Sequence, residues 1–361
     1  MVNETRSQYR SSVAEDFPEE IPIGDVLFKK LRAMKYGENP GMPAALYAEV
    51  GSTGPGVAEY EILQENKDKK LGFINILDLN AGLKIVKRIK ELFPSYAAAS
   101  VSKHVGPSGT ARSGSVFQAY NDAWDTNSLA AFGGVVSFSD QVDADTAKLM
   151  TTRFFECVIA PDYTPGALDV FSKKPDLRVV KVPSLDTKLV DHDYQYIKLE
   201  GGLLVQKRFQ SRVNSAGNFQ SVSNRQPTAN ELEAALFNWN IMPFIVSNAV
   251  TLGTPYRTVG VGRGQDSRID STRLAVYYSN TRCKEGTSKG TVMTSDAFFP
   301  DRDSMDLAGI SGVTCAVAPL GSIKDDKSIQ AANEYGMAFL VPMPELGKPE
   351  VIERAFVHLP H

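Results

Sequence analysis

The sequence predicts an α/β protein, and two kinds of pattern lead to that class. Stretches with apolar residues at helical spacing alternate along the chain with short apolar runs that are typical of buried strands. Hydrophobic residues make up 42% of the 361 residues and charged residues 22%, which is ordinary usage for a globular protein with a sizeable core. Such alternation favours layers of helices around partly parallel sheets.

The first part of the chain contains a regular series of elements after residue 80. Leu83, Val86 and Ile89 recur at helical spacing and predict a helix over residues 81–92. A run of small residues at 97–101 predicts a strand. Further elements are expected as helices over 115–124, 144–155 and 165–172, and as strands over 134–138 and 158–160.

The second part follows a polar stretch, residues 208–227, that is rich in Ser, Asn and Gln. This composition fits a linker or a long surface loop, so we expect one lobe over residues 25–207 and another over 228–361. Residues 1–24 are polar and acidic and are expected to form an extension. The elements expected in the second lobe are helices over 229–239, 268–278 and 325–335, and strands over 244–252, 258–261, 313–318 and 337–341.

Charge, cysteine usage and the N-terminus exclude several classes of protein. A net charge of −3 provides no global positive field for nucleic acid or an anionic membrane. Cys157, Cys283 and Cys315 form no CxxC pair, so neither a disulfide framework nor a zinc site is expected. The N-terminus lacks the apolar core of a secretory signal, and Asn and Pro interrupt the most apolar window, residues 234–252. We therefore expect a cytoplasmic protein that contacts neither membrane nor nucleic acid.

The segment Ser-Lys-His-Val-Gly-Pro-Ser-Gly, residues 102–109, is the first candidate for chemistry. The preceding strand delivers Lys103 and His104 into a turn that we expect at Gly106 to Gly109. A Lys beside a His can divide proton work, because the ammonium donates to an oxyanion or a leaving nitrogen while the imidazole accepts a proton. On spacing alone, a surface Lys and a partly buried His at a strand end is the commoner arrangement.

A glycine turn and an aromatic pair are further candidates for ligand binding. Residues 258–268 match neither a dinucleotide fingerprint nor a phosphate loop, but the glycine turn before a helix offers free N–H groups beside Arg268. Phe298 and Phe299 precede a proline and could stack on a heterocycle. The alternative for the glycine segment is a tight turn without a ligand, and the alternative for the two phenylalanines is ordinary core packing.

Two short segments provide local cations suited to a phosphate. Lys35 stands next to Tyr36, and Arg354 stands close to Phe356 and His358. An Arg can bind a phosphate in bidentate fashion and a Lys as a point charge. Solvated surface charge is the alternative interpretation of both segments.

A series of longer motifs runs in order from about residue 30 to the C-terminus. It includes Phe-Ile-Asn-Ile-Leu-Asp, Ala-Ala-Ala-Ser-Val-Ser-Lys-His-Val, Ala-Phe-Gly-Gly and Ser-Asp-Ala-Phe-Phe-Pro. The motifs lie at 35–40, 73–78, 97–105, 131–134, 156–161, 201–206, 247–250, 259–268, 295–300 and 354–358. In content and order they resemble the transformylase half of the bifunctional purine enzyme that makes inosine monophosphate, which formylates 5-aminoimidazole-4-carboxamide ribonucleotide (AICAR).

This resemblance implies a fold, an assembly and a set of site residues. The fold would be two tandem cytidine-deaminase-like α/β/α lobes without the deaminase zinc, in a homodimer with active sites at the subunit interface. Lys103 and His104 match the family's catalytic pair. The positions that match binding or orienting residues are Lys35, Tyr36, Asn75, Gly133, Glu156, Asn248, Arg268, Phe298, Arg354, Phe356 and His358. A structural monovalent cation is implied near Ser247 and Asp296.

The implied reaction transfers a formyl group from the co-substrate 10-formyltetrahydrofolate to the 5-amino group of AICAR. That amine is a poor nucleophile because its lone pair is delocalised towards the carboxamide. His104 would take its proton, directly or through the carboxamide, and Lys103 would stabilise the oxyanion or protonate the leaving folate nitrogen. Lys35 and Arg354 would neutralise the phosphate, and Phe298 would pack on a ring.

The sequence also departs from the family pattern. Lys35 replaces an Arg, which keeps the charge but loses the bidentate fork. Gly41 and Met42 replace His-Gln, Arg263 replaces a small residue, and Asp301 replaces an aromatic residue. Two other interpretations stay open: a non-catalytic nucleotide-binding paralogue, or a formyltransferase with another one-carbon donor. Because the first motif falls at Lys35, we expect the family's preceding cyclohydrolase domain to be absent and another protein to close the ring.

Overall fold

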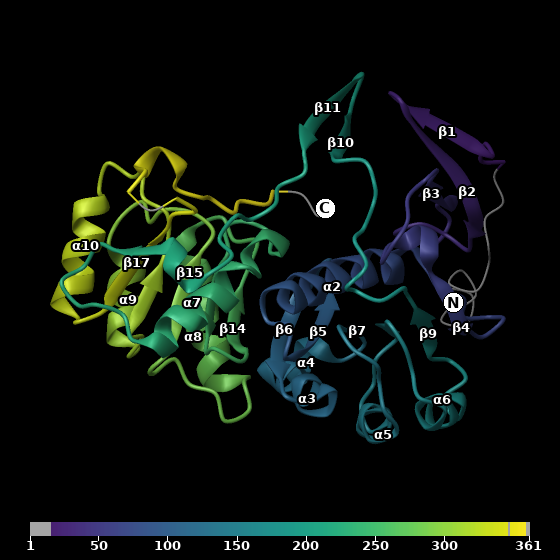
Figure 1. Ribbon diagram of the computed structural model, residues 1–361, viewed down its shortest axis with the longest axis horizontal. Coiled ribbons are helices and arrows are strands. Elements are labelled where there is room, and N and C mark those ends of the chain that lie inside the picture. Colours follow the sequence, from purple (N-terminus) through teal and green to yellow (C-terminus); the bar gives the residue numbers. More distant parts are fainter. Residues whose placement is uncertain (1–15, 346, 359–361) are drawn as a thin grey trace, which may run out of the picture. The chain divides into compact units, whose positions relative to one another are not determined.

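A computed structural model of the chain describes residues 16–345 and 347–358. The chain forms two compact units (Figure 1). Unit 1 contains Met1–Leu83, Ser102–Val105 and Phe132–Arg208, and unit 2 contains Lys84–Val101, Gly106–Ala131 and Phe209–His361. These units interleave along the chain, whereas the sequence analysis expected two consecutive lobes. Part of the expected extension, residues 1–15, lies outside the described residues.

Two six-stranded sheets share one strand order. The first sheet has the order β4 (Glu61–Gln64), β9 (Arg178–Lys181), β8 (Cys157–Ala160), β7 (Val135–Phe138), β5 (Ala97–Lys103), β6 (Gly106–Ser113). The second has the order β12 (Phe219–Ser221), β17 (Ala338–Pro342), β16 (Cys315–Val317), β15 (Val292–Ser295), β13 (Val250–Gly253), β14 (Thr258–Gly262). In each, the strand that comes first in the chain pairs antiparallel with the last. Strands β9, β8 and β7 are parallel neighbours, as are β17, β16 and β15, whereas β13 pairs antiparallel with both β15 and β14. This confirms the predicted α/β class; the likeness of the lobes to cytidine deaminases stays a prediction.

Capping residues explain where several helices begin. In a capping box at the start of α7 (Ala229–Trp239), Thr228 accepts from the Glu231 N–H and Glu231 accepts from the Thr228 N–H. A proline occupies the first turn of α6 (Pro165–Ser172), and Ser267 caps α8 (Arg268–Thr281). The other helices are α2 (Phe73–Leu92), α3 (Val116–Thr126), α4 (Ser128–Ala131), α5 (Ala144–Thr151), α9 (Asp303–Ile310) and α10 (Asp325–Glu334), with 3-10 turns at Val57–Glu59, Ala216–Asn218, Met242–Phe244 and Pro349–Val351. Among the described helices, none combines the length and apolar character needed to cross a bilayer.

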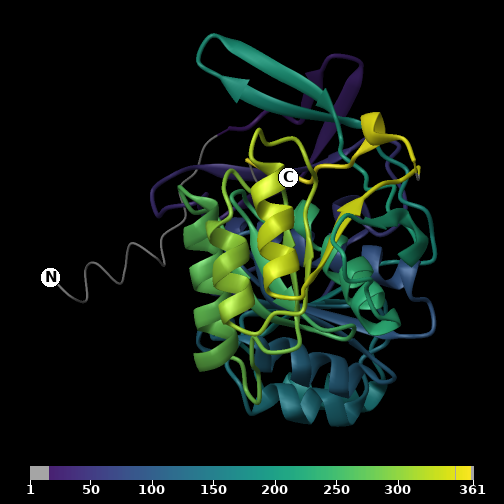
Figure 2. The ribbon, with the colours of Figure 1, turned by 90° about the vertical axis from the view of Figure 1, so that its left-hand side faces the viewer.

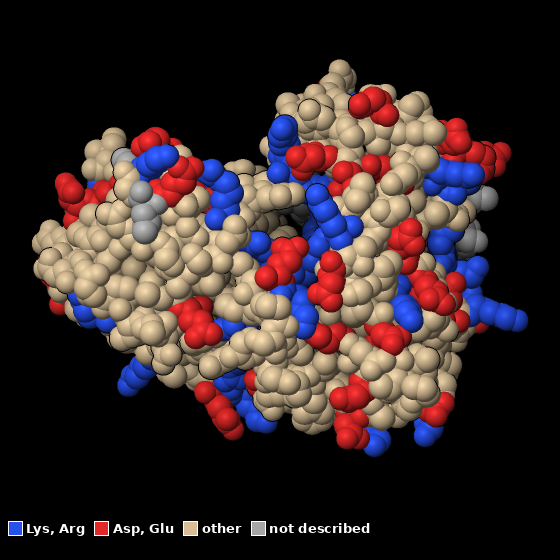
Figure 3. Space-filling view, viewed as in Figure 1, with Lys and Arg blue, Asp and Glu red and all other residues tan. Residues whose placement is uncertain are grey.

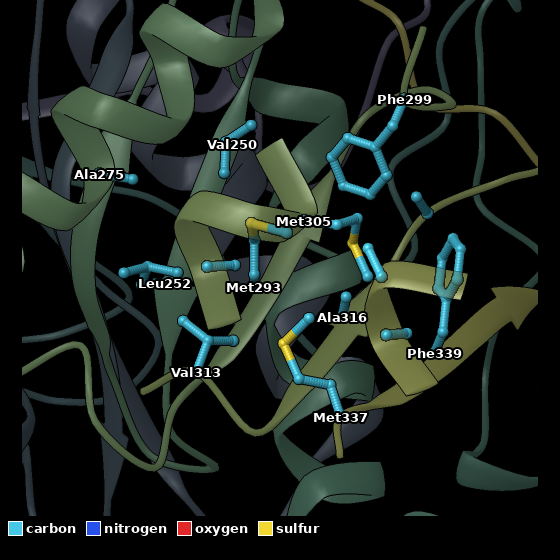
Figure 4. Packing of buried hydrophobic residues seen from close by; sticks show 14 of the residues in the cluster. Val250, Leu252, Ala275, Met293, Phe299, Met305, Val313, Ala316, Met337 and Phe339 are labelled. Carbon is cyan, nitrogen blue, oxygen red and sulfur yellow. The ribbon is translucent and has the colours of Figure 1, made fainter. Parts of the chain in front are cut away.

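The sheet of unit 2 lies between two layers of helix. Helices α8, α9 and α10 pack side by side over one face, and α7 packs against β13, β15 and β16 from the other (Figure 2). Figure 4 shows the core between the sheet and the three helices, where Leu252, Met293 and Phe339 meet Met305 and Met337. Apolar side chains on one face of each strand thus form a continuous core that holds the strand ends in fixed register.

Unit 1 has two smaller antiparallel sheets besides its part of the first large sheet. One joins β1 (Glu20–Ile23), β2 (Val26–Met34) and β3 (Ala44–Glu49). The other is a ribbon of β10 (Tyr194–Leu199) and β11 (Gly202–Lys207) (Figure 1). Apolar side chains on this ribbon are exposed rather than packed, namely Tyr194, Leu199, Leu203, Leu204 and Val205.

Some predicted elements differ from the observed ones. The strand expected over 244–252 begins only at Val250, and a loop carrying Asn248 takes the place of its first half. The expected linker at 208–227 contains β12, which pairs with β17, so part of it belongs to a sheet. The helix expected over 144–155 ends at Thr151, where the chain turns towards β8.

The core contribution of Phe339 provides a test of this packing. Phe339 is 1% exposed, so Phe339→Ala should lower the free energy of unfolding by about 3–5 kcal/mol through lost burial and a cavity. Urea unfolding followed by circular dichroism measures it. Ile323→Ala, at a fully exposed position, is the control and should change stability by less than about 0.5 kcal/mol. Equal stabilities for the two variants would contradict the packing described.

Candidate functional site

The candidate catalytic pair lies where β5 turns into β6. The strand ends at Lys103 and the next begins at Gly106, so His104 and Val105 alone form the turn. Both have positive φ, 54° and 60°, as in a type I′ hairpin turn. The turn expected at Gly106 to Gly109 was therefore wrong. Glycine is the usual signal for this conformation, and here a His and a Val adopt it instead.

The ammonium of Lys103 lies beside a glycine and two exposed phenyl rings. Nζ donates a hydrogen bond to the Phe132 carbonyl oxygen (2.8 Å). A Cβ added to Gly133 would lie at ordinary van der Waals distance from this Nζ (3.8 Å) and from the Phe154 ring (3.5 Å), so the φ of 73°, rather than lack of space, favours glycine here. The Phe132 and Phe154 rings are 5.0 Å apart and 58% and 53% exposed. Sequence reasoning missed this aromatic pair, although Phe132 stands inside the Ala-Phe-Gly-Gly motif.

Two further predicted residues meet in unit 1. Asn75, in the first turn of α2, donates from Nδ2 to Glu156 Oε2 (2.9 Å) and accepts from the Gly72 N–H. Arg178 Nη1 lies 3.8 Å from the same Glu156 oxygen. The neighbouring Cys157 is buried, and burial raises the pKa of its thiol well above the ordinary value, so this cysteine is no candidate nucleophile.

Lys35 and Tyr36 directly follow β2 in unit 1. Lys35 Nζ donates to the carbonyl oxygen of Asp68 (3.3 Å) rather than to another predicted site residue. The turn is closed by a hydrogen bond from the Gly37 N–H to the Met42 carbonyl (2.8 Å). The departures at Gly41 and Met42 therefore belong to the same turn as Lys35.

A buried carboxylate organises the predicted residues of unit 2. Asp296, directly after β15, is fully buried and accepts from Arg268 Nη2 (2.7 Å). It also accepts from the Ser247 hydroxyl and from the Ala249 N–H (3.3 Å). The second nitrogen of the guanidinium, Nη1, donates to the carbonyl of Phe298 (3.2 Å). Arg268 is thus placed to orient Phe298.

Asn248 lies in the loop whose neighbouring residues, Ser247 and Ala249, donate hydrogen bonds to the Asp296 carboxylate. Its Nδ2 donates to the carbonyl oxygens of Gln265 (2.9 Å) and Asp266 (3.3 Å). Its own carbonyl accepts from the Ser271 hydroxyl (2.7 Å). These bonds join the Asn248 loop to the glycine turn before α8. The turn that the sequence singled out for its N–H groups therefore also holds the Asn248 side chain.

The C-terminal segment 353–358 alternates between buried and exposed residues. Glu353, Ala355 and Val357 are buried, and the side chains between them are exposed. Its main chain is held by bonds from the Ala355 N–H to the Asp296 carbonyl (3.0 Å) and from the Ser247 N–H to the Val357 carbonyl (2.7 Å). The predicted residues Arg354, Phe356 and His358 therefore share one exposed face.

Contacts on this face bring further predicted residues together. The Phe356 and His358 rings are nearly parallel with centroids 6.1 Å apart. Arg354 Nη2 donates to the Leu320 carbonyl (3.2 Å). A Cβ on Gly321 would lie 2.8 Å from this nitrogen and 3.6 Å from the Phe298 ring, so Arg354 and Phe298 flank one glycine.

Arg263, which replaces a small residue of the family pattern, lies against the start of β6. A Cβ on Gly106 would lie 1.8 Å from Arg263 Nη1, so this guanidinium covers the first residue of β6. A Cβ at residue 106 would require this guanidinium to move. The larger side chain at 263 thus lies directly on the backbone of β6.

Near the implied monovalent cation, which stays a prediction, Asp296 is already bonded to protein donors. Both oxygens of Asp296 already accept hydrogen bonds, and Arg268 supplies the balancing charge. A monovalent cation would compete with the guanidinium for the same oxygens. Among the described residues, no group of three or more His, Cys, Asp or Glu side chains could hold a metal ion.

Comparison with known proteins identifies the family of this chain. A family profile described as "AICARFT/IMPCHase bienzyme" matches residues 3–278, and the chain belongs to this family. It is 39% identical over 330 residues to the "Bifunctional purine biosynthesis protein PurH" of Persephonella marina, covering 91% of this chain and 61% of that protein.

Two other proteins of the same name match to a similar extent. The identity is 37% for Magnetococcus marinus, over 90% of this chain and 60% of the relative. It is 33% for Acetivibrio thermocellus, over 92% and 61%. The chain therefore spans about three fifths of the length of these curated relatives.

Breaking the Arg268–Asp296 pair should be costly. Asp296→Asn removes the charge that balances a guanidinium only 7% exposed, so the free energy of unfolding should fall by about 3–5 kcal/mol. Denaturant unfolding measures the change. The control is Asp145→Asn, which breaks an exposed pair with Lys148 and should cost less than about 1 kcal/mol. A loss at Asp296 no larger than the loss at Asp145 would show that the pair does not organise this region.

Proposed function

We propose that this chain is an AICAR formyltransferase of purine biosynthesis, which transfers the formyl group of 10-formyltetrahydrofolate to the 5-amino group of AICAR. The supporting observation is the exposed His104 at the tip of a tight turn, next to a Lys103 ammonium held at the Phe132 carbonyl. Membership of the family supports the assignment.

The side chains of Lys103, at the end of β5, and His104, in the turn, would divide the proton transfers. His104 accepts the proton that the amine loses as its nitrogen bonds to the formyl carbon. Lys103 donates to the oxyanion and then gives a proton to the folate nitrogen when the carbon–nitrogen bond to it breaks. The proton taken by His104 and the proton given by Lys103 balance over the reaction.

The remaining predicted residues would bind the two substrates. Arg354 and Lys35 supply positive charge for the ribonucleotide phosphate. Phe298 would pack on a ring. The exposed Phe132–Phe154 pair beside Lys103 offers a surface for the flat rings of the formyl donor. Figure 3 shows acidic and basic side chains intermixed on the face it displays, so phosphate binding would depend on local cations.

A different one-carbon donor is one alternative, and one observation favours it. Asp301 stands where the family usually has an aromatic residue, and it pairs with Lys324. The hydrogen bond from Lys324 lowers the pKa of Asp301, so the carboxylate is charged at neutral pH and offers no stacking ring. A non-catalytic nucleotide-binding paralogue is the second alternative.

Formyl transfer can be measured directly. Protein mixed with AICAR and 10-formyltetrahydrofolate should release tetrahydrofolate between about pH 6 and 9, and His104→Ala should lower kcat by about 10²–10⁴-fold. Lys148→Met, at an exposed position on α5, is the matched surface control.

Each failure of this assay has a defined meaning. Turnover only with formyl phosphate would support the alternative donor. AICAR binding by calorimetry without turnover, and unchanged by His104→Ala, would support the paralogue.

We also propose that the chain forms a homodimer in which the β10–β11 ribbon contacts a second copy. Exposed Leu203, Leu204 and Val205 follow one another along β11, so both faces of the ribbon carry apolar surface. The resemblance implies active sites at the interface, so dimerisation and activity should fall together.

Sedimentation of a ribbon variant tests the dimer. Leu204→Asp should raise the dissociation constant at least tenfold, because a charge would be buried in the interface. Ile310→Asp, also at an exposed apolar position, is the control and should leave the dimer intact. An unchanged dimer in Leu204→Asp would exclude the ribbon as the contact.

A further inference from the structure

The turn that carries His104 has an unusual conformation for its residues. His104 and Val105 both have positive φ, a region that is unfavourable for residues other than glycine and especially for β-branched ones. Such a conformation persists only when the surroundings fix it. The group that fixes it therefore controls where the His104 imidazole points.

A side chain of α2 contacts the main chain of this turn. The Val105 N–H donates to Oδ1 of Asp78 at 2.6 Å. Asp78 lies on α2 and is 4% exposed, so its carboxylate is held by the helix and shielded from water. A hydrogen bond to an ionised acceptor is stronger than one between neutral groups.

Asp78 also belongs to a functional face of its helix. Asn75, which binds Glu156, precedes it by three residues, and positions three apart share one face of a helix. One face of α2 thus contacts both Glu156 and the His104–Val105 turn. The rigid helix ties the position of the turn to that of the Asn75–Glu156 pair.

We propose that Asp78 is a positioning residue: its carboxylate holds the left-handed His104–Val105 turn and thereby aims the His104 imidazole at the reacting amine. This inference rests on the proposed function for its effect on turnover. The contact with the Val105 N–H is independent of that function.

Kinetics of Asp78 variants test the effect on turnover. Asp78→Ala should lower kcat for AICAR by about 10- to 100-fold and change KM by less than about threefold, because a misplaced imidazole impairs proton transfer more than binding. Asp78→Asn keeps the shape and a weaker acceptor, so it should lie between Asp78→Ala and wild type. Glu91→Gln, an exposed carboxylate on the same helix, is the control.

A second substitution separates positioning from a general loss of stability. Glycine adopts positive φ readily, so Val105→Gly in the Asp78→Ala background should recover at least threefold in kcat. A purely structural role would give no such recovery. Wild-type kcat in a folded Asp78→Ala or Asp78→Asn variant would overturn the proposal.

Hydrogen exchange at the Val105 amide gives a readout that needs no activity. It should be protected in the wild type and exchange at least tenfold faster in Asp78→Ala, with Asp78→Asn between them. If the wild type shows no formyl transfer, the proposed function fails, and faster exchange still supports Asp78 as the residue that holds the turn. Equal exchange in the wild type and both Asp78 variants would overturn the inference.

Discussion

The carboxylate of Asp296 imposes the constraint on which the candidate site of unit 2 depends. A fully buried charge must be paired and hydrogen-bonded, because its desolvation is otherwise costly. Arg268 and the Ser247–Ala249 loop provide the donors. Since the main chain of Asp296 also bonds to Ala355, segments distant in sequence are fixed by one residue. The loop of Asn248 and the Arg354 segment therefore keep a defined relation within this unit.

Unit 1 also uses carboxylates to hold neighbouring segments, in contacts that involve the start of α2. Glu156 accepts from Asn75, and Asp78 accepts from the main chain of the turn after β5. Both contacts come from the first two turns of α2, whose position is set by its burial against the sheet. Here the helix is the rigid element, and the turn with its exposed imidazole is the part that must be held.

Apolar periodicity predicted the first residue of α7 and of α8 because that signal is local, and the proline of α6 lies within the helix that it starts. The same pattern missed α9 and the first two turns of α2, which carry Asn75 and Asp78. The β10–β11 ribbon was missed because its apolar residues have no buried face and lack a clear period. The type I′ turn was missed because His104 and Val105 are not residues that usually adopt positive φ.

For the candidate site, the sequence predicted which residues take part, but it did not predict which side chains contact one another. Lys103 and His104 were placed at a strand end from local sequence, and the resemblance supplied the other positions. That Arg268 would pair with Asp296, 28 residues away, depends on how β15 and α8 lie in the folded unit. The neighbours Phe132 and Phe154 likewise become a pair only through folding.

The two arginines of unit 2 illustrate why folding decides function. Arg268 is buried, and Asp296 neutralises its charge. Arg268 can therefore orient neighbouring groups, but it contributes little net charge to the binding of a ligand. Arg354 is exposed and, within the described residues, bonds to a carbonyl rather than to a carboxylate, so its charge stays available. This difference follows from the alternation in 353–358, where burial of Glu353 and Ala355 forces Arg354 outward. A chain with net charge −3 can therefore present a cation to a phosphate without any excess of basic residues.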